Sequence, residues 1–238
     1  FEPEAWPLRW YRQMVGISSI GDTTVVSDKW MLGTRNSFFV GIIATLLATA
    51  LGTVAALGLS RPHMPFKPVL MAILISPMIV PLIITAAGMF FFYSKIGLTH
   101  SYLGLILAHT ALGTPFVVIT VTATLTGFDT NLIRASQSLG ADTMRTFFKI
   151  IMPLILPGVI SGGLFAFITS FDEVVVVMFI GSVEQITIPK QMWAGLRQET
   201  SPVILCMATC LVALSIALLT TVEMLRRRSE RLRGIKHR

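Results

Sequence analysis

The sequence predicts an all-α integral membrane protein. Of its 238 residues, 53% are hydrophobic and only 13% are charged, whereas a soluble domain carries about 25% charged residues. The apolar residues form long runs without the period-two alternation of a membrane β-barrel. The net charge is +7, but the basic residues gather at the ends of the apolar runs, which fits orientation in a membrane and not a nucleic-acid partner. An ordinary soluble enzyme, a disordered chain and a disulfide-stapled secreted module are excluded.

Five stretches are long and apolar enough to cross a bilayer, which takes about 20 residues. We expect these membrane-crossing helices at about residues 36–60, 68–93, 102–126, 154–181 and 202–225. Small residues at helical spacing predict close packing of the first and fourth helices against their neighbours. They are Gly41, Ala44, Ala48, Gly52 and Ala55 in the first helix, and Gly158, Ser161, Gly162 and Ala166 in the fourth. Pro77, Pro81 and Pro115 predict bends in the second and third helices.

The distribution of basic residues predicts a cytoplasmic C-terminus. The basic tail, residues 226–238, and the segments between the first and second and between the third and fourth helices hold twelve Lys and Arg, against seven on the other side. The side with the excess faces the cytoplasm. Five crossings in the transmembrane domain, residues 36–225, then leave residues 1–35 outside the cell membrane. We therefore expect a further transmembrane helix before Phe1, and a cleaved signal peptide is the alternative.

The longest cytoplasmic loop, residues 128–153, predicts a stiff elbow of two short helices. Asp129 or Thr130 can cap the first helix, and Gly140 suits the left-handed position that ends it. Asp142 can then cap a second helix. An apolar ridge too short to anchor in lipid lies on one face of the first helix, and it is shaped to seat in a groove of another protein. The ridge consists of Leu132, Ala135, Ser136 and Leu139.

Two carboxylates, Asp172 and Glu173, fall inside the fourth expected helix, toward its outer end. An ionised carboxylate in hydrocarbon costs at least about 2.5–3.5 kcal/mol, so each must face a partner or water. One interpretation is a structural hydrogen bond between helices, and the other is a cation-attracting group on a substrate path. The functional interpretation is stronger for Asp172 than for Glu173.

The elbow resembles the cytoplasmic coupling motif of bacterial ABC importer permeases. That motif reads Glu-Ala-Ala, three residues, Gly, nine residues, Ile, one residue, Leu-Pro. The matching positions here are Ala135, Ser136, Gly140, Ile150, Met152 and Pro153, with the same spacing throughout. Arg134 stands where the family has Glu, which reverses the charge. Residues 171–176 and 188–197 are similar to the spermidine/putrescine branch of the family, and more narrowly to its second permease subunit.

This resemblance implies the type I ABC importer permease fold, with six helices around a five-helix core, in the bacterial inner membrane. It implies three partners: an ATPase dimer, a second and different permease subunit, and a periplasmic binding protein. ATPase coupling then falls on Leu132, Arg134, Ala135, Ser136, Leu139, Gly140, Ala141 and Phe147. The substrate path falls on Phe171, Asp172 and Glu173. The binding protein is expected to contact the outer loop, residues 182–201, at Gln191, Trp193 and Arg197. The alternative role of this loop is to anchor the chain at the membrane interface.

The chain is expected to be a transport permease and not an enzyme. It has no Gly-x-x-x-x-Gly-Lys-Ser/Thr phosphate-binding loop, so ATP and Mg²⁺ belong to a separate ATPase, and no cofactor or metal is expected in this chain. The two acidic residues favour a cationic solute, a polyamine first, and another amine, an amino acid or an opine-like compound is the alternative. A secondary transporter or channel is the alternative class, but the internal repeat and coupling-ion residues of a secondary transporter are not found.

Overall fold

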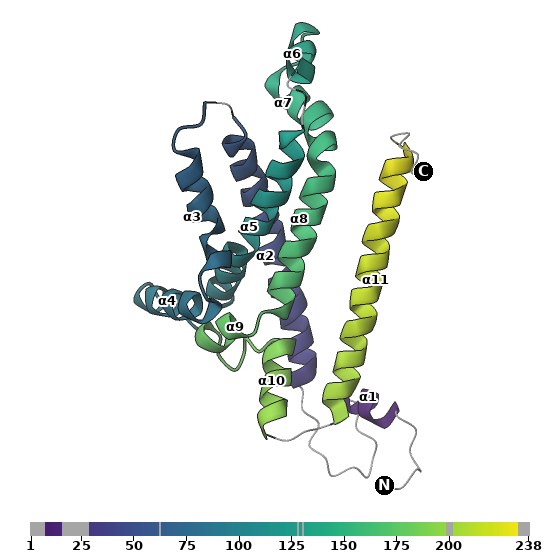
Figure 1. Ribbon diagram of the computed structural model, residues 1–238. Helices are drawn as coiled ribbons and strands as arrows, with labels where there is room; N and C mark the ends of the chain where they lie inside the picture. The colour runs from purple at the N-terminus through teal and green to yellow at the C-terminus, as the bar shows by residue number, and fades with distance from the viewer. Residues whose placement is uncertain are drawn as a thin grey trace. The chain divides into compact units, whose positions relative to one another are not determined.

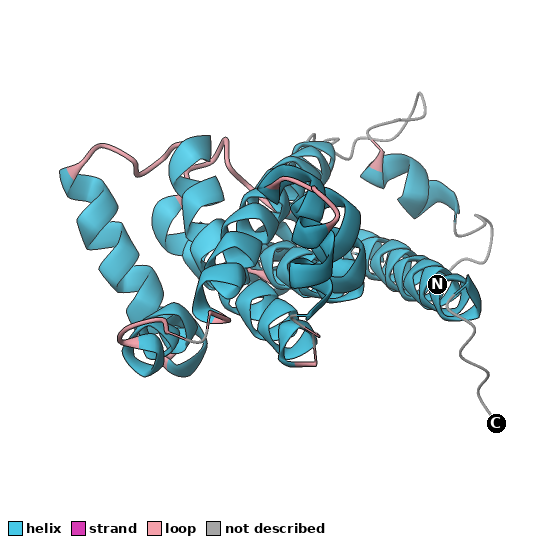
Figure 2. Cartoon of the chain, turned by 90° about the horizontal axis from the view of Figure 1, so that it is seen from above, coloured by secondary structure: helices cyan, strands magenta, loops and turns pink. Residues whose placement is uncertain are grey.

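The structure, a computed structural model, describes residues 8–15, 29–61, 63–127, 129, 131–198 and 202–232. Figure 2 shows helices and connecting loops throughout these ranges. The chain divides into two compact units, one formed by residues 1–32 and 191–238 and the other by residues 33–190. The predicted all-α class is confirmed for the described residues.

The smaller unit contains α1 (Leu8–Met14) packed on α11 (Pro202–Leu232). The greater part of α10 (Ile188–Gln198) also belongs to this unit and lies close to α11, because a Cβ atom on Gly195 would come within 2.8 Å of Ile204 Cδ1. The fifth expected crossing falls on α11, whose first sixteen residues, Pro202–Ala217, are an apolar helix. The last six residues of the predicted basic tail, 233–238, lie outside the described residues.

The larger unit begins within α2 and contains the elbow and the carboxylates. Figure 1 follows its elements in order. They are α2 (Lys29–Leu59), α3 (Lys67–Ile79), α4 (Leu82–Lys95), α5 (Tyr102–Thr126), α6 (Asn131–Ser138), α7 (Thr143–Thr146), the π-helix η1 (Phe147–Ile151), α8 (Met152–Asp172) and α9 (Val175–Ile180). Helices α7, η1 and α8 form one continuous helical stretch from Thr143 to Asp172.

Among the described residues, three helical stretches are long and apolar enough to cross a membrane by themselves. These are α2, α5 and the stretch from Thr143 to Asp172, and α3 with α4 forms a fourth crossing if the bent pair is taken as one span. The chain is thus a multi-pass membrane protein by its helices. Five crossings stay a prediction, since α11 supplies only the shorter apolar segment given above.

Small residues let α2, α5 and α8 approach closely at the centre of the larger unit. A Cβ on Gly162 of α8 would lie 2.8 Å from Val117 Cα of α5, and a Cβ on Gly52 of α2 would lie 2.7 Å from Val117 Cβ. The predicted small-residue packing of α2 and α8 is therefore confirmed at these glycines. The prediction is wrong at Ser161, which is exposed and takes no part in this packing.

The second expected crossing, residues 68–93, is not one straight helix. It breaks between Ile79 and Leu82, and the axes of α3 and α4 differ by 104°. Pro81 has no N–H to continue the helix, and it forces the preceding Val80 into an extended conformation, with ψ 134°. Pro115, in contrast, lies within α5 and does not interrupt it.

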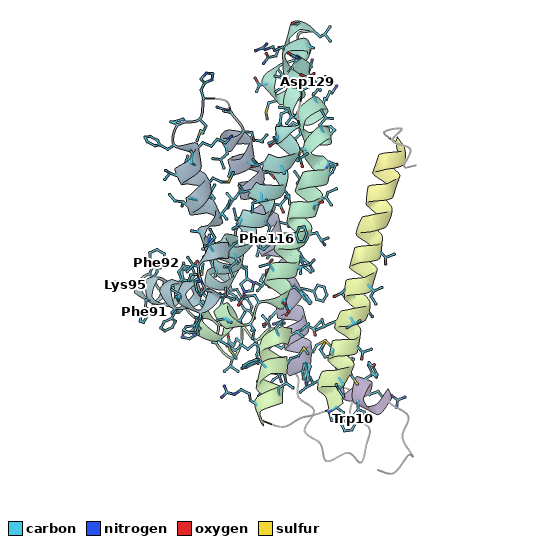
Figure 3. The ribbon with its side chains drawn as sticks, in the orientation of Figure 1. Trp10, Phe91, Phe92, Lys95, Phe116 and Asp129 are labelled. Carbon is cyan, nitrogen blue, oxygen red and sulfur yellow. The ribbon has the colours of Figure 1, made fainter. Side chains whose placement is uncertain are left out.

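The fourth expected crossing, residues 154–181, is also displaced. The continuous helix begins earlier, at Thr143, and ends at Asp172, so that Val175–Ile180 forms the separate helix α9. Helix α9 packs against α4, and its buried residues Val176, Val177 and Ile180 join a hydrophobic cluster with residues of α2, α4 and α5. On its other side α4 exposes Phe91 and Phe92, which point outward in Figure 3.

Candidate functional site

The first short helix of the elbow, α6, starts and ends as its sequence predicts. Asp129 Oδ1 accepts a hydrogen bond of 2.9 Å from the backbone N–H of Asn131 at the start. Gly140 has φ +82°, in the left-handed region, and its N–H donates to Gln137 O at the end. Because glycine takes this conformation without steric cost, the chain can reverse immediately into the next helix.

The second part of the elbow begins at an equally clear cap. Asp142 Oδ1 accepts a 2.7 Å hydrogen bond from Arg145 N–H and so begins α7. After one turn the helix widens into η1, a π-helix at Phe147–Ile151 that the sequence pattern did not reveal. The widened turn stands just before Pro153, which cannot donate the hydrogen bond of an α-turn. Helix α7 therefore passes into α8 without a break.

A buried contact between two hydroxyl groups joins α6 to α7. Ser136 Oγ lies 2.9 Å from Thr146 Oγ1, and both side chains are buried. Ala141 N–H also donates to Ser136 O across the turn. The expectation that Ser136 forms part of the exposed ridge is therefore wrong, since its side chain faces α7 instead. This hydrogen bond and the one across the turn tie α6 to α7.

The rest of the predicted ridge is exposed. Leu132 and Ala135 are exposed, and the side chain of Leu139 is 88% exposed. Figure 1 shows α6 and α7 at one end of α8, and Figure 3 labels Asp129 there. Of the other residues expected to couple with an ATPase, Arg134 and Gly140 are exposed, whereas Ala141 and Phe147 are half-buried. An exposed leucine on a stiff, capped helix is a feature suited to docking on another protein.

The expected substrate-path residues lie at the opposite end of α8. Phe171 is held between two other rings, with ring centroids 5.2 Å from Phe38 and 5.3 Å from Phe167. The Glu173 side chain is only 6% exposed, and its Oε1 accepts a 2.8 Å hydrogen bond from Val176 N–H. Asp172, the last residue of α8, is exposed. The two adjacent carboxylates thus have different surroundings.

The structure also reveals a group of side chains that fix the segment after α9, which sequence reasoning missed. Asn36 Nδ2 donates to the carbonyl oxygens of Glu184 (2.7 Å) and Ile186 (2.9 Å), and Tyr102 Oη donates to Asn36 Oδ1. Lys190 Nζ donates to three carbonyl oxygens around the end of α9. An asparagine at the start of an apolar helix was the one available signal, since such a side chain needs a partner.

The residues expected to contact a binding protein lie on α10, in the smaller unit. Trp193 and Arg197 are exposed and Gln191 is half-buried. The exposed face of α10 therefore carries an aromatic and a basic side chain, a combination that suits either a protein partner or the membrane interface. Among the described residues, no group of three or more His, Cys, Asp or Glu is placed to hold a metal ion.

Comparison with known proteins agrees with this fold. Residues 48–231 match the family of binding-protein-dependent transport system inner membrane components. The chain is 30% identical over 203 residues to the spermidine/putrescine transport system permease protein PotC of Haemophilus influenzae, covering 85% of this chain and 79% of that protein. It is 26% identical over 216 residues to the putrescine transport system permease protein PotI of Escherichia coli K12, covering 87% and 73%.

A solved structure supports the fold independently. The inward-facing structure of the MetNI methionine ABC transporter matches with a TM-score of 0.68 and 19% identity, over 83% of this chain and 94% of that one. The chain therefore belongs to the family of binding-protein-dependent transport system inner membrane components. It is a membrane permease of the ABC importer type, with the type I importer fold.

Proposed function

We propose that this chain forms half of the translocation path of an ATP-driven importer for a small cationic solute, a polyamine first. The observation that carries the proposal is the stiff elbow with its exposed Leu132–Ala135–Leu139 face, the ridge, at the end of the continuous helix from Thr143 to Asp172. The names of the relatives support a polyamine. Another amine, an amino acid or an opine-like solute is the alternative within the class.

The elbow would couple this chain to an ATPase subunit. The ridge would seat in a cleft of the ATPase, and the Ser136–Thr146 contact would let the elbow move without bending. Because the elbow continues into α8, its displacement would reach Asp172 through one helix. Closure of an ATPase dimer around ATP and Mg²⁺ would then switch the path from inward-open to outward-open, and hydrolysis would reset it.

The solute would meet the path at the end of α8. Asp172 is the exposed carboxylate there, and a polyamine offers two or more ammonium groups to it. The carbonyl end of a helix carries partial negative charge, which favours a cation at the same place. Glu173 does not serve as a second ligand in this scheme, because its side chain is buried and its Oε1 accepts the N–H of Val176.

The other partners follow from the same proposal. A second, different permease subunit would complete the path, and a periplasmic binding protein would deliver the solute to Gln191, Trp193 and Arg197 on α10. The chain would lie in the bacterial inner membrane with its C-terminus in the cytoplasm, as its basic residues indicate. A secondary transporter or channel would need none of the ATPase contacts.

The test is the ATPase activity of the reconstituted importer with its binding protein. We expect putrescine or spermidine to stimulate hydrolysis, and Ala135→Glu to reduce both ATPase binding and uptake by at least about tenfold, because the seat would bury an unpaired charge. Gln137→Glu is the matched control, since residue 137 is exposed on the same helix about 200° from residue 135. Uptake without any co-purifying ATPase would favour the secondary transporter, and stimulation by another solute alone would exclude the polyamine.

A further inference from the structure

Helix α9 is a helix that its own sequence does not favour. It has six residues, Val-Val-Val-Met-Phe-Ile, of which four are β-branched. Such residues lose side-chain freedom in a helix, and isolated helices shorter than about 12 residues are marginal in water even with better helix formers. Its buried apolar side chains explain why the segment packs against α4, but they do not explain why it packs as a helix.

An acidic side chain holds the first turn of α9. The backbone N–H groups of a first turn have no partner within the helix. Glu173 Oε1 accepts the N–H of Val176 at 2.8 Å, and its side chain is buried. The side chain of Glu173 therefore acts as a cap at the end of α9 where the backbone N–H groups lack partners.

A basic side chain holds the last turn. Lys190 Nζ donates to Val177 O at 3.3 Å, and to Gly181 O and Ser182 O at 3.2 Å each. These carbonyl groups are at the negative end of α9. Burial lowers the pKa of Lys190, because removing the ammonium group from water disfavours its charged form. The three carbonyl oxygens are the groups that accept its hydrogen bonds in this enclosed position. A short helix thus has a carboxylate at one end and an ammonium at the other.

The chain that carries Lys190 is itself anchored to α2. Asn36 Nδ2 donates to the carbonyl oxygens of Glu184 and Ile186, and Ser37 Oγ accepts the N–H of Ile188 at 2.9 Å. Lys190 therefore reaches α9 from a fixed base. On the other side, His100 N–H donates to Ile180 O at 2.8 Å and ties α9 to the start of the α5 region.

We propose that Lys190 and Glu173 are positioning residues that clamp α9 at its two ends and thereby fix the direction of Asp172 on the substrate path. This inference rests on the proposed function. Asp172 is bonded directly to Glu173, and the break between α8 and α9 consists only of residues 173 and 174. If α9 unwinds, Glu173 loses its partner, and the carboxylate of Asp172 is no longer held toward the path.

The experiment is concentration-dependent putrescine uptake by the complete importer, with KM and Vmax determined separately. We expect Asp172→Asn, Lys190→Met and Glu173→Ala each to raise KM about tenfold, with Vmax less affected. A tenfold change corresponds to the free energy of about one hydrogen bond to a charged group. Lys190→Arg and Glu173→Gln should restore KM to within about twofold, because arginine still donates to carbonyl groups and glutamine still accepts from Val176 N–H.

The decisive measurement combines Lys190→Met with Asp172→Asn. If Lys190 acts through Asp172, the double variant has the KM of Asp172→Asn alone, whereas independent roles give about a hundredfold increase. A hundredfold increase would overturn the proposal, and so would equal KM values for Glu173→Gln and Glu173→Ala, which would make Glu173 a substrate ligand. If Lys190→Met does not assemble, the two Glu173 variants decide.

The proposed function can fail separately. If putrescine still stimulates the ATPase but Asp172→Asn leaves KM unchanged, the importer stands, while the path assignment of Asp172 and the positioning role are both overturned. If no polyamine is taken up by the unaltered importer, the choice of solute is wrong, and the same set of variants is measured with the solute that does stimulate ATP hydrolysis. The double-variant criterion is then unchanged.

Discussion

Gly140 sets the angle between α6 and α7, because it alone in the turn takes a positive φ, +82°. A Cβ built on it would meet no atom within 4 Å. The only obstacle to another residue is therefore the conformation of the backbone itself. A left-handed conformation costs an ordinary L-residue about 1–2 kcal/mol, and asparagine less.

We expect Gly140→Val to weaken ATPase binding by about tenfold or more and Gly140→Asn to weaken it only slightly, since about 1.4 kcal/mol corresponds to a factor of ten. The measurement is the affinity of the purified ATPase for the permease in detergent or nanodiscs. Equal affinities for the two variants would mean that the turn can be built with a negative φ and that Gly140 has no special role.

Ser136 illustrates what a sequence can and cannot say about a single residue. The spacing of Leu132, Ser136 and Leu139 predicts one helical face, and the helix itself is found. Which of these side chains meets α7 depends on the turn at Gly140. The position of α7 is a matter of tertiary structure, which the spacing of residues in α6 does not determine. The sequence therefore predicts Ser136 on the exposed ridge, whereas in the structure its side chain lies against Thr146.

At the scale of elements, the contact of α5 with α8 depends on glycines that have no room for a side chain. A Cβ on Gly162 would lie 2.8 Å from Val117 Cα, a backbone atom that cannot turn aside. In a membrane, helices associate through such close packing, because lipid gives them no hydrophobic drive. The α5–α8 pair is thus sensitive to a single methyl group.

We expect Gly162→Ala to destabilise the protein by about 1–3 kcal/mol, the usual effect of an added methyl group in a filled interior. Gly88→Ala, in the exposed part of α4, is the matched control, because a Cβ there meets nothing within 4 Å. Thermal unfolding in detergent compares the two variants. A Gly162→Ala transition temperature equal to that of Gly88→Ala would mean that the helices can separate at no cost.

Apolar length and proline positions predict where the chain enters the membrane but not how each crossing runs. The third crossing was expected at residues 102–126, and α5 has those bounds. The second contains Pro77 and Pro81, yet only Pro81 stands at the break. Both prolines remove a donor, so the choice between them depends on the packing of α4 against α9. The sequence also does not predict the end of α8 at Asp172, because the apolar run continues through α9.

At the scale of the molecule, the helix from Thr143 to Asp172 joins the elbow to the segment that contains α9. Its 30 residues correspond to about 45 Å at 1.5 Å per residue. The Ser136–Thr146 contact ties α6 to α7 at the elbow. Beyond the other end of the helix, Lys190 bonds to α9 and Asn36 bonds to the segment after α9. Within residues 33–190, the two ends should therefore move together.

We expect the distance between spin labels at Leu139 and Val183, both strongly exposed, to change by less than about one helical turn, 5.4 Å, when the importer binds ATP. Double electron–electron resonance measures this distance, and a label pair between this chain and its partner permease serves as the moving reference. A larger change within the chain would show that α8 bends during the cycle and does not transmit motion as one body.

The π-helix η1 gives the residue count between Gly140 and Pro153 a geometric meaning. Along a continuous helix each residue adds about 100° of rotation, so this count sets the azimuth at which the ridge leaves the membrane relative to the small-residue face of α8. One residue lost from η1 or added to it would turn the ridge by about a quarter of a circle, with every contact inside α6 intact. The nine-residue interval between Gly140 and Ile150 therefore sets the direction in which α6 points. If that interval were altered, the ridge would point away from the ATPase cleft proposed for it, even with the sequence of α6 unchanged.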